Sequence, residues 1–71
     1  MDNLQIRARI AAQTDTKNYL ERVLEAIDNL NKEQKFSRDA YLEVKSRIES
    51  KILECKKAIN EASRLLIDNC L

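Results

Sequence analysis

Residues 41–66, YLEVKSRIESKILECKKAINEASRLL, decide the fold of this chain. Apolar residues recur in this stretch at steps of three or four, which is the spacing of one face of an α-helix. The members of this stripe are Tyr41, Val44, Ile48, Ile52, Cys55, Ile59, Ala62 and Leu66. The residues between them are mostly charged and alternate in sign, as on a solvated helix face. The stretch therefore predicts a long amphipathic helix.

The sequence also predicts where this helix begins. Ser37 is a favourable N-cap residue, and Asp39 falls in the first turn, where negative charge suits the helix dipole. Phe36 and Tyr41 have the spacing of a hydrophobic staple around that cap. We expect this helix to run from about residue 38 to 68.

The first half of the chain carries a matching stripe with a polar interruption. Its members are Leu4, Ile6 and Ile10, then Leu20, Val23 or Leu24, Ile27 and Leu30. Residues 13–18, QTDTKN, are mediocre helix formers because Thr, Asp and Asn side chains compete for the backbone. One interpretation is a single helix over about residues 3–34, and the other is a break with Thr14 or Thr16 capping a second segment. The absence of Gly and Pro favours the single helix.

Two helices of nearly equal length joined by roughly three residues must lie antiparallel. We expect an all-α, coiled-coil-like, antiparallel two-helix hairpin that forms one domain over residues 1–71. Opposed residues would have numbers that sum to about 71 or 72. The expected pairs are Leu30–Tyr41, Ile27–Val44, Leu24–Ile48, Leu20–Ile52, Ile10–Ala62 and Ile6–Leu66. Gln13 and Lys17 would face Ile59 and Cys55, which makes a weak point in the packing.

Composition excludes several classes of function. The net charge is +1, from 13 basic and 12 acidic residues, so general affinity for nucleic acid is not expected. No apolar run approaches the roughly 18 residues that a membrane span needs. The N-terminal residues lack the pattern of a secretory signal. These features predict a cytoplasmic protein.

The residues needed for catalysis are missing as well. There is no histidine, so the chain alone cannot assemble a Cys/His zinc site or a Cys–His nucleophile. Without glycine it has no phosphate-binding loop. Cys55 is expected to be a small buried apolar residue. Cys70 would lie about 22 Å from it on a straight helix, too far for a disulfide. We expect no enzyme activity, cofactor or metal.

Some apolar residues do not fit the predicted helix–helix contact. They are Leu4, Val23, Leu42, Leu53, Leu65 and Ile67. A two-helix protein of this size can barely offset its conformational entropy from its own core. We therefore expect these six residues to bind another protein, although self-association would cover them as well.

Four features of the sequence occur together. They are the stripe Leu20, Leu24, Ile27 and Leu30, a short basic connector, the tyrosine of Asp39-Ala40-Tyr41-Leu42, and the Ala/Ile-rich residues 55–66. Over about residues 4–67 the chain resembles the YscE/SsaE-like co-chaperones of type III secretion systems. The resemblance implies a helical hairpin that binds a helical-repeat (TPR-like) chaperone. The pair would keep the needle subunit a soluble monomer in the bacterial cytoplasm.

Two other functions compete with this one. The first is a small regulatory binding module, such as a kinase inhibitor or a phage-encoded antagonist, whose target lies outside secretion. The second is a DNA-associated protein, which the interleaved acidic and basic residues make less favourable.

Overall fold

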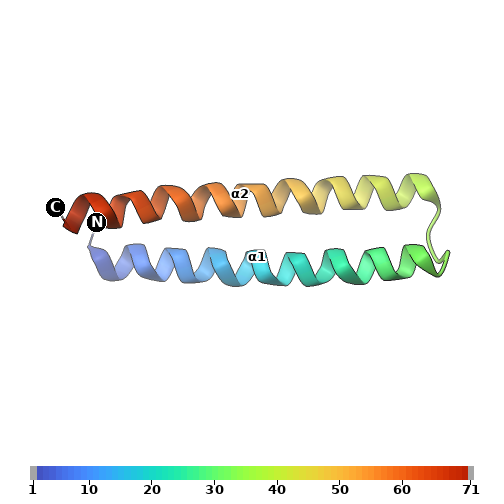
Figure 1. Ribbon diagram of the computed structural model, residues 1–71, viewed down its shortest axis with the longest axis horizontal. Helices are drawn as coiled ribbons and strands as arrows, with labels where there is room; N and C mark the ends of the chain where they lie inside the picture. The colour runs from blue at the N-terminus through green and yellow to red at the C-terminus, as the bar shows by residue number, and fades with distance from the viewer. Residues whose placement is uncertain (1, 71) are drawn as a thin grey trace.

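Two antiparallel α-helices make up the molecule. A computed structural model describes residues 2–70, without the side chains of residues 69 and 70. Helix α1 spans Asn3–Lys32 and helix α2 spans Arg38–Cys70. They lie side by side along their whole length, and both ends of the chain lie at the end opposite the connector (Figure 1). The all-α helical hairpin predicted from the sequence is confirmed.

Helix α1 is continuous through its polar middle. Asp2 caps its start, where its carboxylate accepts the backbone N–H of Gln5 at 2.8 Å. Within the polar stretch the Thr16 hydroxyl donates to the carbonyl oxygen of Ala12 at 3.0 Å, which satisfies the hydroxyl without breaking the helix. The expected single helix is therefore confirmed, and the alternative with a break is wrong. The helix ends at Lys32, two residues before the expected end.

The connector closes α1 with a Schellman motif. The N–H of Lys35 donates to the carbonyl oxygen of Leu30, and that of Gln34 to the carbonyl oxygen of Asn31, both at 3.0 Å. This pattern requires a left-handed residue, and Gln34 supplies it with a φ of 61°. A residue with a Cβ therefore holds a conformation that helix ends usually give to glycine.

Helix α2 begins where the sequence predicts. The Ser37 hydroxyl accepts the N–H of Ala40 at 3.2 Å, which confirms Ser37 as the cap, and Asp39 lies in the first turn. The helix extends to Cys70, two residues beyond the expected end.

The helices meet along one row of shielded side chains on each, which we call the seam. On α1 the seam residues are Ile6, Ile10, Gln13, Lys17, Leu20, Leu24, Ile27 and Asn31. On α2 they are Tyr41, Lys45, Ile48, Ile52, Cys55, Ile59, Ala62 and Leu66. Both rows alternate steps of four and three without exception, which is the repeat of a coiled coil. Pairing the two rows in opposite chain directions gives residue numbers that sum to 72.

Two predicted seam residues lie outside the seam. Leu30 and Val44 are 39% and 38% exposed, and Asn31 and Lys45 occupy the positions expected for them. The predicted stripe took two successive steps of four, from Val44 to Ile48 to Ile52, which suits a straight helix with 3.6 residues per turn. Packed helices keep a repeat of 3.5 residues, so the seam turns to Lys45 instead. The predicted seam positions Leu30 and Val44 are therefore displaced by one residue, to Asn31 and Lys45.

Candidate protein-binding flanks

A two-helix seam leaves two long flanks beside it. In an antiparallel coiled coil, the residues next to the seam on one side of each helix face one another across a common flank. The leucine flank carries the exposed side chains of Leu4, Leu42, Leu53 and Ile67. The tyrosine flank carries Tyr19, Val23, Leu30, Val44 and Leu65.

The six residues predicted to bind a partner are divided between these flanks. Their heptad positions place Leu4, Leu42, Leu53 and Ile67 on the leucine flank. The same positions place Val23 and Leu65 on the tyrosine flank, where Val23 is half-buried and Leu65 is exposed. The six residues therefore do not form one surface.

The leucine flank is hollowed in the half nearer the connector. A groove of about 800 Å³ is lined by Leu24 and Ile52 of the seam and by Leu42 and Leu53 on its edge. Leu42 and Leu53 are separated by about 16 Å along α2, at 1.5 Å per residue. Polar lining comes from Glu21, Glu49, Lys45 and Lys56. A side chain laid into this groove would meet apolar walls and charges of both signs.

The leucine flank also has apolar side chains near its two ends. Leu42 lies towards the connector, while Leu4 and Ile67 lie at the open end of the hairpin. Together with Leu53, these side chains are between 49% and 78% exposed. The large apolar residues of this flank are therefore spread over nearly the full length of the rod.

The tyrosine flank contains a residue that the sequence interpretation missed. Tyr19 is 62% exposed and follows the same helix face as Val23, Ala26 and Leu30. These four residues are spaced by four, three and four, which is a second heptad row on α1. That spacing is visible in the sequence and would have revealed the flank.

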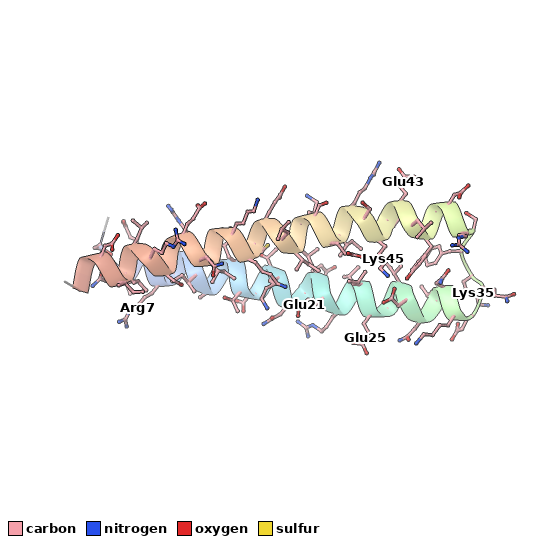
Figure 2. The ribbon with its side chains drawn as sticks, turned by 45° about the horizontal axis from the view of Figure 1, so that its top comes forward. Arg7, Glu21, Glu25, Lys35, Glu43 and Lys45 are labelled. Atoms are coloured by element: carbon pink, nitrogen blue, oxygen red, sulfur yellow. The ribbon has the colours of Figure 1, made fainter. Side chains whose placement is uncertain are left out.

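A polar cluster closes the seam beside the connector. The Tyr41 hydroxyl donates to the Asp28 carboxylate at 2.5 Å and accepts from the Lys45 ammonium at 3.3 Å. The Lys45 nitrogen also lies 5.5 Å from the centre of the Tyr41 ring. Figure 2 shows Lys45 between the helices, whereas Glu25 and Glu43 point away from them. The hydrogen bond to Tyr41, with the nearby Asp28 charge, raises the pKa of Lys45 above its usual value.

Three further features of the described residues concern metal sites, thiols and membrane spans. Within residues 2–70 no group of His, Cys, Asp or Glu side chains is arranged to hold a metal ion. Cys55 is a free, buried thiol in the seam, and the side chain of Cys70 lies outside the described part. Neither described helix is long and apolar enough to cross a membrane.

No protein-family model matches the chain, and no curated protein or solved structure matches it. The two flanks therefore carry the functional argument. The leucine flank has the groove and the most exposed aliphatic side chains, and so is the stronger candidate for binding a different protein.

Proposed function

We propose that the hairpin is a protein-binding module that serves as a small co-chaperone of a type III secretion system. Its leucine flank would lie on a helical-repeat (TPR-like) chaperone, and the pair would keep the needle subunit soluble and monomeric. The observation that supports binding is the exposed apolar row Leu4, Leu42, Leu53 and Ile67. The secretion role rests on the resemblance described from the sequence.

The energetics of the leucine flank favour a partner. Full burial of one leucine or isoleucine side chain is worth about 1.5–3 kcal/mol relative to exposure. The four side chains are about half exposed or more. Much of the free energy of burying them would therefore be gained only when an interface covers them. A handful of buried anchors of this size is what protein interfaces typically rely on.

The shape of the hairpin suits a helical-repeat partner. Its principal extents are 52 × 15 × 13 Å, so it is a thin rod. Helical-repeat proteins form long concave surfaces that accept extended or helical segments. A rod with apolar residues along one flank can lie in such a surface and bury them together.

The test is co-expression of the full chain with the helical-repeat chaperone and the needle subunit of the same secretion system. Size exclusion with light scattering should show a complex containing one copy of the hairpin per chaperone. Leu53→Asp and Ile67→Asp should each weaken this complex, because each places a carboxylate in the apolar contact. Leu65→Asp is the matched control, since it makes the same change on the tyrosine flank and should leave the complex intact.

Circular dichroism of each isolated variant separates binding from folding. Unchanged helicity with lost binding assigns the residue to the interface, whereas lost helicity assigns it to the hairpin core. Absence of any complex between the three wild-type chains would remove the secretion role. Affinity capture that repeatedly yields one target outside secretion would favour the regulatory module instead.

A further inference from the structure

Helix α1 carries a second apolar row in addition to its seam. From residue 12 onwards its members are Ala12, the uncharged Thr16, Tyr19, Val23, Ala26 and Leu30, with alternating steps of four and three, and one step further towards the N-terminus the row reaches Arg9. The corresponding row of α1 on the leucine flank contains Arg7, Glu21, Glu25 and Asp28. A helix with two heptad rows packs against two neighbouring helices. Helix α2 covers only one of these rows.

The angle between the two rows of α1 indicates what kind of assembly they fit. The second row precedes the seam by one residue, which is about 100° around the helix at 3.6 residues per turn. In a four-helix bundle each helix contacts two neighbours at about a right angle, so the rows match that arrangement. The hairpin provides two of the four helices.

Helix α2 supplies a charge pattern on the same flank. Towards the connector its flank residues are Arg47 and Lys51, and towards the open end they are Glu54, Glu61 and Asp68. Arg47 is paired with Glu43 at 2.8 Å on its own helix, but this pair is exposed and therefore weak. The basic and acidic halves are thus both available to a partner.

We infer that the tyrosine flank binds a second copy of this chain, in reversed orientation, to form an antiparallel four-helix bundle. A two-fold axis perpendicular to the helices places α1 on α1 and α2 on α2 of the second copy. With the ends of the two rods aligned, residues 12–23 of this row on one α1 meet the same residues on the other. Arg47 of one α2 then meets Glu61 of the other, and Lys51 lies within one helical turn of Glu54, which is beside the axis.

The other two-fold arrangement is unfavourable. An axis parallel to the helices would lay the charged row of α2 on the apolar row of α1. Arg47, Lys51 and Glu54 would then lose water without gaining partners, which is costly. The distribution of charge therefore selects the reversed orientation.

The size of the flank is sufficient for a stable dimer. A face of 52 by 15 Å has about 800 Å² in projection, which is the area that each partner contributes to a standard interface. The hairpin exposes 5612 Å², whereas a compact monomer of 8.3 kDa exposes about 4,600 Å². The dimer would remove much of this excess. It uses the flank opposite the groove and does not depend on the secretion role.

The test is the mass of the full chain by sedimentation equilibrium. The wild-type protein should have twice the 8.3 kDa mass of the chain. The charge-reversed variants Arg47→Glu/Lys51→Glu and Glu54→Lys/Glu61→Lys should each weaken the dimer by about tenfold or more, because like charges then meet. An equimolar mixture of the two variants should restore a dimer that contains one of each. Lys57→Glu/Arg64→Glu is the control for Arg47→Glu/Lys51→Glu, because it makes the same change in net charge at residues away from both flanks. It should remain dimeric.

Three results would overturn the inference. One is a wild-type protein that stays monomeric at hundreds of micromolar. Another is a control variant that loses the dimer as fully as Arg47→Glu/Lys51→Glu does. The third is a dimer abolished by Leu53→Asp on the leucine flank yet unaffected by the charge reversals. All substituted residues are exposed, and circular dichroism will verify that each variant remains helical.

Discussion

Gln34 carries the backbone strain of the connector. Its φ of 61° allows the two hydrogen bonds that end α1 and turn the chain towards α2. The left-handed conformation costs a residue with a Cβ about 1–2 kcal/mol. The hairpin therefore tolerates at this position a cost that glycine would avoid.

Gln34→Gly should raise the free energy of unfolding by about 1 kcal/mol, after allowance for the greater freedom of glycine in the unfolded chain. For a chain of this size, that corresponds to a rise of roughly 4–8 °C in Tm. Thermal denaturation followed by circular dichroism at fixed concentration measures the change. Gln34→Val is the contrasting variant and should lower the Tm, since β-branched residues disfavour positive φ.

Lys45 shows how a polar residue can occupy the seam. Its stem lies between the helices while its ammonium group contacts the Tyr41 hydroxyl, which is itself bonded to Asp28. Because the folded state raises the pKa of Lys45, protonated Lys45 stabilises that state. This contribution is fully present below the unfolded pKa of 10.5 and is lost as the pH rises through the higher folded value.

The hairpin should therefore lose stability above about pH 10.5 more steeply than its Lys45→Met variant does. Tyr41→Phe removes the hydroxyl that contributes most to the raised pKa, so it should remove much of the same difference. Urea denaturation at a series of alkaline pH values measures the effect. Identical pH profiles for wild type and Lys45→Met would show that the cluster does not favour the protonated lysine.

At the scale of the helices, α1 contributes the weaker half of the seam. Gln13 and Lys17 are half-buried at the levels of Ile59 and Cys55. Lys17 reaches out of the seam to form an ion pair with Glu21 at 3.3 Å. The middle of the rod is thus covered by a lysine stem where an apolar residue would pack more closely.

Lys17→Leu should stabilise the hairpin by about 1 kcal/mol, because the gain from a partly buried leucine exceeds the few tenths lost with the ion pair. The midpoint of urea denaturation should rise accordingly. Lys57→Leu makes the same substitution on the outer face of α2 and should change stability by less than about 0.5 kcal/mol. Equal effects of the two substitutions would argue against a seam position for residue 17.

The sequence predicts these helices well because their caps and apolar stripes are local features. Ser37 and the residues from Ile48 to Leu66 fall where the pattern predicts them. The apolar stripe does not predict the seam positions of Asn31 and Lys45. Both residues are polar, and a polar residue in the sequence is normally assigned to the solvent-exposed face. Their positions follow from the strict heptad repeat that two packed helices impose on each other.

The candidate surfaces were harder to predict than the helices. The sequence predicts that Leu53 and Ile67 are exposed, because neither belongs to the apolar stripe. Which flank they lie on depends on which residues of each helix form the seam. A shift of one residue moves a side chain by about 100° around the helix. The second row through Tyr19 does not follow from the stripe of seam residues, because it lies about 100° around α1 from that stripe.

The whole molecule has an extended shape and a small core. Its radius of gyration is 16.0 Å, against about 11 Å for a compact domain of 71 residues. Among the described side chains the buried apolar ones are Ile6, Ile48, Ile52, Cys55 and Ala62. A rod with so little interior buries little apolar surface of its own, so association with another chain would add to its stability.

The Tm should therefore rise with protein concentration. If two copies associate, each tenfold increase in concentration adds up to about 1.4 kcal/mol to the apparent stability. Thermal scans from micromolar to hundreds of micromolar measure this dependence. Arg47→Glu/Lys51→Glu should show the same rise only at concentrations that are about tenfold higher or more, and a constant Tm for the wild type would contradict association.

The rate at which a reagent modifies the buried thiol of Cys55 can measure how often the two helices separate. A thiol reagent can reach it only during moments when the two helices part, so its rate of modification reports how often they do. With Cys70 replaced by serine, one exponential trace would follow that breathing motion. A bound partner or a second copy should slow the trace, because both hold the helices together. Association of the hairpin with another chain would thus be measured as a lower rate of Cys55 modification.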